Sequence, residues 1–250
     1  MKQRADQMLV QRGLAESRTR AQALILAGKV FSGDRRVAKA GDMLAEATPL
    51  EVRGQDHPWV SRGGLKLAHG LAHFGFSPAG RVCLDVGSST GGFTDVLLAH
   101  GAAKVHAVDV GHGQLAWKLR RDDRVTVHEK TNARYLDHTH IPDPIEAMVC
   151  DASFIGLSTV LPAPLALCVR GAWAIALIKP QFEAGAAAVG SKGVVRDPAV
   201  HRDVCQRISA WWARLAGWTV LGIEESPITG PEGNKEFLLG ATCARDIATQ

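Results

Sequence analysis

The sequence predicts an α/β protein in which a small α+β domain precedes a larger domain built on a doubly wound parallel sheet. Two observations predict this fold. From Arg81 onward, short apolar runs alternate with segments of helical spacing, which is the pattern of parallel strands joined by crossover helices. Before them, a basic segment is set apart by residues 54–64, "GQDHPWVSRGG", whose glycines and proline are typical of a domain boundary. We therefore expect domains at 1–58 and 65–250, joined by a linker at 59–64.

The small domain is predicted to open with two helices. The first covers residues 2–12 and the second residues 17–27, with Ser17 as its N-cap and Gly28 at its end. "KVFSGDRRV" then predicts a hairpin that turns at Gly33, and "TPLEVRG" a last short strand. Residues 1–39 hold nine lysines and arginines but three acidic residues, although the net charge of the chain is only +4. Such a basic module indicates a polyanion-binding surface, with a simply solvated basic face as the alternative.

The larger domain is predicted from its alternating pattern. "LKLAHGLAHFGF" predicts a leading helix because Leu67, Leu71 and Phe74 have helical spacing. The last two strands are expected to close the sheet as an antiparallel pair. Strands are predicted at 81–87, 103–111, 125–130, 145–153, 171–180, 218–228 and 234–243, and the other helices at 90–101, 113–121 and 197–217.

Composition excludes several classes of protein. The five cysteines are scattered without metal-ligand spacing, which favours reduced thiols and a cytoplasmic location. The beginning of the chain lacks an apolar signal core, and no run reaches the ~20 apolar residues that span a bilayer. His69 and His73 are four residues apart, but the sequence offers no evident third ligand. We therefore predict no metal site and no membrane partner.

A glycine-rich turn after the first strand of the sheet predicts a nucleoside site. In "LDVGSSTGGFTD", Asp85 is followed by glycines at 87, 91 and 92, which allow a close backbone approach to a ligand. Asp109 ends the second strand, where a carboxylate can accept hydrogen bonds from ribose hydroxyls, and Asn132 follows the third strand. The alternative is that these residues only form turns and caps. Because the loop has no phosphate-binding lysine, S-adenosylmethionine fits best, with Asp85 near its ammonium group.

Four charged residues are candidates for chemistry at the same edge of the sheet. Lys179 ends the apolar run "AWAIALIK", and Asp151 ends the neighbouring strand. Glu236 and Lys66 are expected to reach the same crevice, although each alone also reads as an ordinary surface charge. Desolvation and a second ammonium nearby lower the pKa of a lysine, so we expect Lys179 to deprotonate a ribose hydroxyl, with Lys66 lowering its pKa. Asp151 and Glu236 would orient the two lysines.

Ordered motifs along the chain resemble one family. "RADQMLVQRGLAESRTRAQALILAGKVFSG" resembles the RNA-binding module of ribosomal protein S4, with Ala5 and Ser32 in place of the usual leucine and asparagine. "WVSRGGLKL", "LDVGSSTGGFTD", "AVDVGHGQL", "CDASFI", "IKPQFE" and "SPITGPEGNKEF" resemble the TlyA family, often named haemolysins. The resemblance implies a Rossmann-like, seven-stranded methyltransferase sheet of the FtsJ type.

The resemblance also assigns roles to individual residues. It implies a catalytic Lys66, Asp151, Lys179 and Glu236. It implies a cofactor site formed by Asp85, Gly87, Ser88, Ser89, Thr90, Gly91, Gly92, Phe93, Asp109, Val110, Asn132 and Asp151. The cations expected to contact RNA are Arg4, Arg18, Arg20, Lys29, Arg35, Arg36 and Arg62.

These residues predict transfer of a methyl group from S-adenosylmethionine to a ribose 2′-hydroxyl, and the resemblance implies ribosomal RNA as the substrate, with cytidine as the expected nucleotide. The expected partners are ribosomal RNA or ribosomal subunits, with no protein partner. The alternatives are a membrane-active haemolysin and a non-catalytic RNA-binding protein. Methylation of a base nitrogen is disfavoured because residues 151–154 read D-A-S-F rather than N-P-P-Y.

Overall fold

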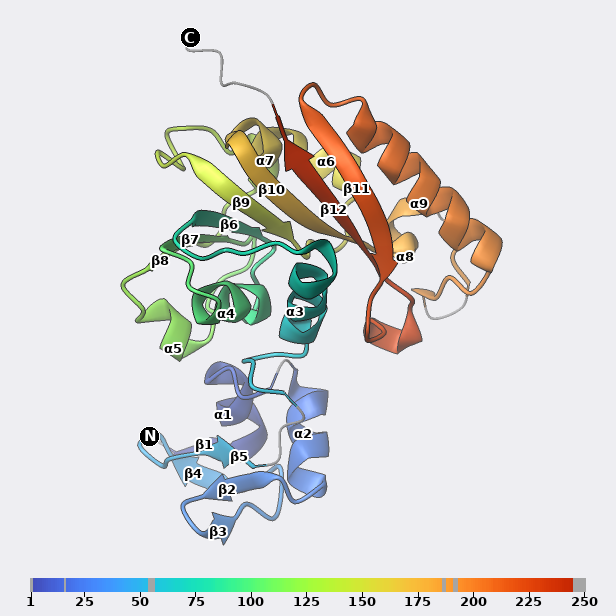
Figure 1. Cartoon of the computed structure of the whole chain (residues 1–250). Coiled ribbons are helices and arrows are strands. Elements are labelled where there is room, and N and C mark those ends of the chain that lie inside the picture. The colour runs from blue at the N-terminus through green and yellow to red at the C-terminus, as the bar shows by residue number, and fades with distance from the viewer. Residues whose placement is uncertain (1, 16, 54–56, 186–187, 191–192, 245–250) are drawn as a thin grey trace.

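The computed structural model describes residues 2–15, 17–53, 57–185, 188–190 and 193–244 of the chain. In Figure 1 a small domain lies below a larger one, and the chain between them passes into α3. Part of the predicted linker, residues 54–56 of the 54–64 segment, lies outside the described residues, and the predicted domain limits stay a prediction. In the part of the chain that the structure describes, no helix combines the length and apolar character needed to cross a membrane.

The small domain packs two helices against short strands. Its core contains Leu9, Leu24, Ile25 and Val30, which are all buried. Ser17 caps α2 by accepting a hydrogen bond from the Arg20 N–H, as predicted. The elements are β1 (Lys2–Arg4), α1 (Ala5–Gln11), α2 (Arg18–Leu26), β2 (Val30–Ser32), β3 (Arg35–Arg36), β4 (Met43–Ala45) and β5 (Glu51–Val52).

The start of the small domain differs from the prediction. Residues 2–4, predicted as part of the first helix, form β1, which pairs antiparallel with β4. Residues 2–4 are all polar and show no pattern of apolar residues that would favour a helix or a strand. Their conformation is therefore decided by pairing with β4, about forty residues later in the chain. The predicted hairpin is confirmed, because β2 pairs with β3 around Gly33, whose φ is +57°.

The larger domain is a seven-stranded sheet in the order β11-β12-β10-β9-β6-β7-β8. β6 to β10 run parallel, and β12 inserts antiparallel between β10 and β11, so the predicted antiparallel closure is confirmed. The strands are β6 (Val82–Val86), β7 (Lys104–Val108), β8 (Val125–His128), β9 (Ile145–Cys150), β10 (Cys168–Ile178), β11 (Trp218–Glu225) and β12 (Phe237–Cys243).

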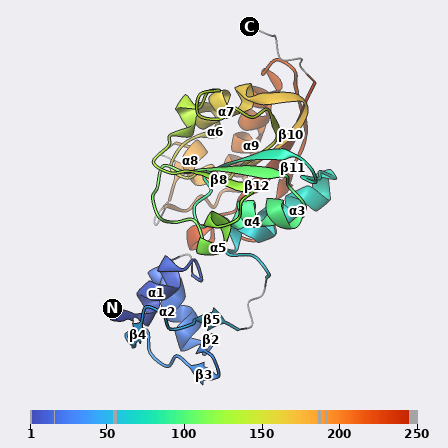
Figure 2. The ribbon, with the colours of Figure 1, turned by 90° about the vertical axis from the view of Figure 1, so that its left-hand side faces the viewer.

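Helices cover both faces of this sheet, as Figure 2 shows nearly edge-on. One apolar cluster joins the sheet to α3, α4 and α5, and the other joins it to α6, α7 and α9. The helices are α3 (Gly63–Phe74), α4 (Gly92–Ala99), α5 (Trp117–Arg120), α6 (Leu157–Val160), α7 (Pro162–Ala166), α8 (Pro180–Glu183) and α9 (Pro198–Ala213), with 3₁₀ turns at Ala133–Tyr135 and Pro231–Gly233.

Two predicted elements are shorter in the structure. The helix predicted at 113–121 is only the one-turn α5, because Gly113 donates its N–H to Glu129 and so belongs to a loop. The long helix predicted at 197–217 ends at Ala213. β10 is longer than predicted and begins at Cys168, with a register shift between Cys168 and Trp173. The 113–116 segment contacts the glycine-rich turn after β6, because the Ala116 N–H donates a hydrogen bond to the Thr90 carbonyl at 3.1 Å. The other two differences lie at the end of α9 and at the start of β10.

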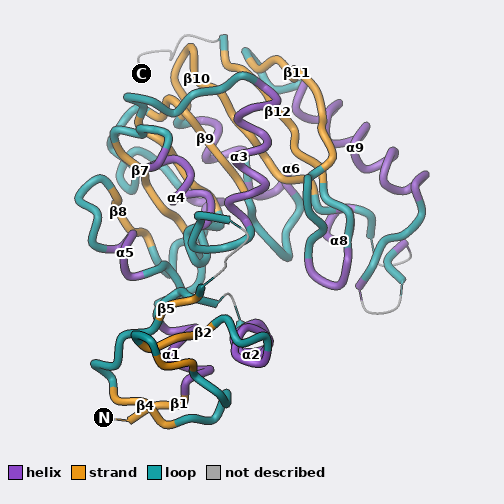
Figure 3. The backbone as a smooth tube through the Cα atoms, turned by 60° about the horizontal axis from the view of Figure 1, so that its bottom comes forward, coloured by secondary structure: helices purple, strands orange, loops and turns teal. Residues whose placement is uncertain are grey.

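The strand order reverses between β6 and β9, since the chain moves outward through β7 and β8 before it returns to β9. In a doubly wound sheet, ligands bind beyond the carboxyl ends of the strands at such a switch point. In Figure 3, the small domain lies beneath the larger one, on the side where α5 and α8 lie. The two domains approach closely, because a Cβ on Gly13 would lie 2.8 Å from the Cβ of Ala116.

Candidate active site

A cavity of about 990 Å³ opens at the carboxyl ends of β6, β9 and β10. Its wall combines residues that lie far apart in the sequence, including Lys66 of α3, Asp151 after β9 and Lys179 after β10. Ser17 of the small domain also lines it, so the cap of α2 reaches the rim of this cavity. The cavity therefore joins the glycine-rich turn, the candidate catalytic residues and the small domain.

Lys66 and Glu236 form a buried ion pair in this cavity. Lys66 Nζ donates a hydrogen bond to Glu236 Oε2 at 2.6 Å, and both side chains are almost fully buried. Burial works against the charge of Lys66, but the carboxylates of Asp151 and Glu236 outweigh it and raise its pKa. Lys66 is therefore a fixed ammonium group at neutral pH. Glu236 Oε1 has no hydrogen-bond partner among the described residues.

Lys179 is held by the loop that follows β9. Its Nζ lies 2.7 Å from Asp151 Oδ1, and it donates hydrogen bonds to the Asp151 carbonyl at 3.0 Å and to Ser153 Oγ at 2.8 Å. The side chain is only 8% exposed, and its strand ends where Pro180 begins α8. Proline at the first helical position keeps the strand from continuing, so Lys179 projects at the end of the sheet instead of into its core.

The glycine-rich turn after β6 leaves no room for a Cβ at Gly87 or Gly92. Gly87 has a φ of +80°, and a Cβ on it would lie 2.8 Å from the Cα of Ala152. A Cβ on Gly92 would collide with Ser61 Oγ and lie 2.9 Å from the Gly64 nitrogen. The turn is thus pressed against both the Asp151 loop and the segment before α3. Five residues of the predicted cofactor turn line the cavity besides Gly87, namely Ser88, Ser89, Thr90, Gly92 and Phe93, whereas Gly91 does not.

Asp85 lies beneath this turn and is fully buried. Thr94 Oγ1 donates a hydrogen bond to its Oδ2 at 2.7 Å, while Oδ1 has no partner among the described residues. Burial raises the pKa of Asp85 to about 7, and the Thr94 hydrogen bond works in the opposite direction. A buried carboxylate oxygen without a donor is costly in free energy. A cationic ligand group would satisfy it, although Asp85 itself does not line the cavity.

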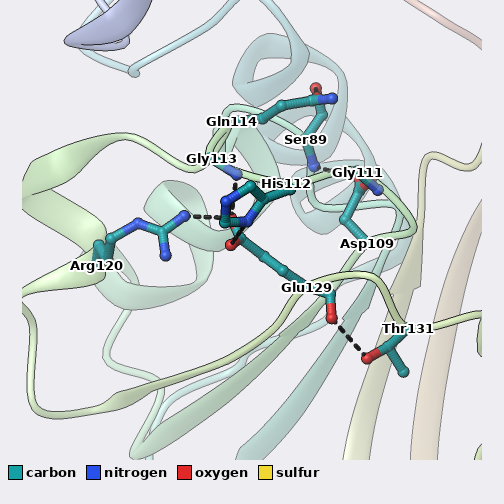
Figure 4. Close-up of polar contacts among 9 residues, drawn as sticks. All are labelled: Ser89, Asp109, Gly111, His112, Gly113, Gln114, Arg120, Glu129 and Thr131. Atoms are coloured by element: carbon teal, nitrogen blue, oxygen red, sulfur yellow. Dashed lines mark hydrogen bonds and ion pairs between the residues drawn. The ribbon is translucent and has the colours of Figure 1, made fainter.

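Asp109 directly follows β7 and lies beside the turn, as Figure 4 shows. Its Oδ2 accepts a hydrogen bond from the Ser89 N–H at 2.8 Å, and its Oδ1 accepts one from the Gly111 N–H at 2.7 Å. The carboxylate therefore ties the glycine-rich turn to the loop after β7. Each oxygen retains a lone pair for a ribose hydroxyl.

Two other residues predicted for the cofactor site lie outside the cavity. Val110 is 70% exposed, and Asn132 caps the 3₁₀ turn by accepting the Arg134 N–H at 3.1 Å. Neither of them, nor Asp109, lines the cavity. The structure thus brings Lys66, Asp151, Lys179 and Glu236 together in the cavity. Asp109, Val110 and Asn132 lie outside it.

The basic residues of the small domain are not equivalent. Asp6 is fully buried and accepts hydrogen bonds from Arg4, Arg18 and Gln22, which holds its pKa well below the usual range. Arg18 thus ties α2 to α1, whereas Arg4 pairs with Asp6 at the first turn of α1. The remaining predicted RNA contacts include exposed Arg35 and Arg36 and half-buried Arg20 and Lys29, while half-buried Arg62 lines the cavity.

Sequence reasoning missed an aromatic pair at the cavity. Phe154 and Phe182 both line it, with ring centroids 5.0 Å apart. Phe154 is 89% exposed and has a φ of +64°, which is strained for a bulky residue. A large exposed apolar ring in a strained backbone conformation indicates a functional residue. The spacing of apolar residues along the sequence does not identify it.

Sequence reasoning also missed Glu129. Figure 4 shows this residue beside the loop after β7, where it accepts hydrogen bonds from the Gly113 N–H at 2.8 Å and from His112. The Arg120 guanidinium pairs with it and is the main reason that the pKa of Glu129 falls to about 2. The only signal in the sequence was an acidic residue just after a strand.

Comparison with known proteins agrees with this geometry. Residues 59–243 match the family of FtsJ-like methyltransferases, and residues 3–47 match the S4 domain. YqxC of Bacillus subtilis is 48% identical over 95% of this chain and 85% of its own length. The 16S/23S rRNA (cytidine-2′-O)-methyltransferase TlyA of Mycobacterium tuberculosis is 47% identical over 98% of this chain and 91% of its own length.

A solved structure supports the same relationship. A protein of Streptococcus thermophilus that carries the name hemolysin superposes with a TM-score of 0.77 and 41% identity, covering 98% of this chain and 90% of its own. Sequence and structure agree over both domains. The chain therefore belongs to the TlyA family of FtsJ-like methyltransferases, with an S4 domain at its N-terminal end.

Proposed function

We propose that this protein transfers a methyl group from S-adenosylmethionine to the 2′-hydroxyl of a cytidine in ribosomal RNA. The observation that supports this most is the joint position of Lys66, Asp151, Lys179 and Glu236 in one cavity beside the glycine-rich turn. The activity named for the Mycobacterium tuberculosis relative agrees with it. Ribosomal RNA or a ribosomal subunit is then the partner, and the cytoplasm is where the enzyme meets it.

The residues around the glycine-rich turn fit S-adenosylmethionine. The unpaired, buried oxygen of Asp85 suits the ammonium group of the cofactor, and Asp109 suits ribose hydroxyls. Gly87 and Gly92 bring the backbone close to the ligand. S-adenosylmethionine, when bound, supplies an electrophilic methyl group on its sulfonium.

Lys179 and Lys66 have different roles toward the ribose 2′-hydroxyl group. Lys179, in its neutral amine form and oriented by Asp151 and Ser153, accepts the proton of the 2′-hydroxyl and becomes an ammonium group beside the Asp151 carboxylate. Lys66 remains an ammonium group beside Glu236 and stabilises the negative charge that develops on that oxygen. The buried cavity wall holds both lysines in place, which aligns acceptor and donor for an in-line transfer.

The cavity rim and the small domain account for RNA binding. Exposed Arg35 and Arg36 contact phosphates, which position the enzyme without reading sequence. Phe154 offers an aromatic face for a base that has left its stack, since the 2′-hydroxyl must enter the cavity.

Methyl transfer from tritiated S-adenosylmethionine to purified ribosomal subunits tests the proposal, with mass spectrometry to map the modified nucleotide. Lys179→Ala should abolish transfer while S-adenosylmethionine still binds. Lys104→Ala, which removes a lysine paired with Asp143 away from the cavity, is the matched control and should retain activity. Wild-type transfer by Lys179→Ala would refute the catalytic role, and a methyl group on a base would refute the reaction.

A further inference from the structure

Beside the cavity, α3 and the edge strand β11 bring two histidines and a glutamate together. His69 and His73 are one helical turn apart on α3, and their ring centroids are 6.1 Å apart. Glu224 comes from β11, 155 residues after His69. The sequence showed only the two histidines, so the packing of α3 against β11 supplies the third group.

The ligand atoms of these three side chains face one another. Glu224 Oε1 lies 3.3 Å from His69 Nε2, and Oε2 lies 3.8 Å from His73 Nδ1. One ligand atom from each residue falls within 4.8 Å of both others. Ligands at about 2.0–2.2 Å from a tetrahedral ion are separated by roughly 3.3 Å, so small side-chain rotations suffice to hold an ion.

We propose that His69, His73 and Glu224 bind a divalent transition-metal ion, with Zn²⁺ as the ion of choice. Two imidazoles and one carboxylate are a common ligand set for such ions, whereas Mg²⁺ and Ca²⁺ prefer oxygen ligands alone. The three side chains are 36%, 41% and 35% exposed, so an ion can enter and water can complete its coordination.

The position of the site indicates what the ion does. His69 lies one turn after Lys66 on the same helix, and Glu224 is paired in register with Leu238, two residues after Glu236. An ion at this site ties α3 to the β11–β12 hairpin, the two elements that carry the Lys66–Glu236 ion pair. Its role is that of a structural clamp next to the cavity, separate from methyl transfer.

Titration of the untagged, full-length, chelator-treated protein with Zn²⁺ alone tests this proposal. We expect one equivalent per chain, lost or weakened at least about 10-fold in His73→Gln and in Glu224→Gln. His140→Gln is the matched control, because His140 also pairs with a carboxylate, Asp137, but belongs to no three-ligand group among the described residues. Its binding should equal that of the wild type.

Two further measurements distinguish a built site from adventitious Zn²⁺ binding at surface histidines or cysteines. At a Zn²⁺ concentration 100-fold above the dissociation constant, the wild-type melting temperature should rise by about 5–10 °C, and those of His73→Gln and Glu224→Gln should not. In chelator all variants should melt near the wild-type temperature, which shows that they fold. Co²⁺ should give visible d–d bands without a thiolate charge-transfer band. Unchanged Zn²⁺ binding in both variants, thiolate bands, or no binding by the wild type at micromolar Zn²⁺ would overturn the proposal.

Discussion

Lys66 and Glu236 are 170 residues apart in the sequence, yet their side chains form a buried hydrogen-bonded ion pair of 2.6 Å in the cavity. β12 is antiparallel to β10, and its register pairs Phe237 with Ile178. The next residues outward, Glu236 and Lys179, therefore reach the same end of the sheet. Because β12 runs antiparallel to its neighbours, its beginning places the Glu236 carboxylate at the carboxyl ends of the parallel strands, where the site lies.

Removing the charge of Glu236 should disable the site while its shape is kept. In Glu236→Gln, Lys66 loses its hydrogen-bonded counter-ion, and we expect methyl transfer to fall by about 10²-fold or more. Single-turnover transfer of a tritiated methyl group measures this. Glu225→Gln, which changes a half-exposed glutamate paired with Lys235, is the control. Equal rates in the two variants would contradict the role given to Glu236.

Gly230 is predicted to be necessary for the same ion pair. A Cβ at this position would collide with Glu236 Oε1. Gly230→Ala should therefore displace the carboxylate, slow methyl transfer and destabilise the fold by about 1–3 kcal/mol, the usual cost of overpacking. Gly222→Ala is the control, because its Cβ would meet nothing within 4 Å. A Gly230→Ala enzyme with wild-type kinetics and melting temperature would contradict this prediction, because it would show that the loop accommodates the added methyl group without loss of activity or stability.

Phe154 is predicted to act on RNA and not on the cofactor. Stacking of a base on an aromatic ring contributes about 1–3 kcal/mol, so Phe154→Ala should lower kcat/KM for RNA by roughly 5- to 150-fold. Its affinity for S-adenosylmethionine should stay unchanged in calorimetry, and Phe154→Tyr should restore activity. Loss of cofactor affinity in Phe154→Ala would mean instead that the ring supports the fold of the cavity.

Much of the fold could be predicted because its signals are local. The apolar run that ends at Lys179, followed by Pro180, already indicated a strand with a lysine at its carboxyl end. The alternation after Arg81 predicted the parallel sheet, and the turn at Gly33 predicted the small hairpin. Each of these features depends on the residue itself and its immediate neighbours.

What the sequence did not reveal depends on contacts between distant segments. Residues 2–4 form a strand only because β4 pairs with them. The ion pair of Lys66 with Glu236 follows from the β12 register, which a strand pattern alone does not specify. Phe154 was missed because an exposed ring in a left-handed conformation has no periodic signal. Glu224 was missed because it approaches α3 only in the folded chain, 155 residues after His69.

Asp85 should make both stability and cofactor binding depend on pH. Its folded-state pKa is about 7, against an ordinary value of 3.8, because it is buried. Between about pH 4 and 7 the folded state therefore holds a proton that the unfolded state has released. The free energy of unfolding must fall as pH rises through this window, by at most about 4 kcal/mol for a shift of about 3 units.

Asp85→Asn removes this dependence and separates the two roles. The variant should be more stable than the wild type at pH 8, with a flatter profile between pH 4 and 7 in chemical denaturation. It should also bind S-adenosylmethionine at least about 10-fold more weakly at pH 8, because a neutral amide cannot neutralise the ammonium group. Wild-type affinity should fall below pH 7 as Asp85 takes up its proton, whereas the affinity of Asp85→Asn should not follow that titration. Parallel pH profiles in the two proteins would show that another group controls binding.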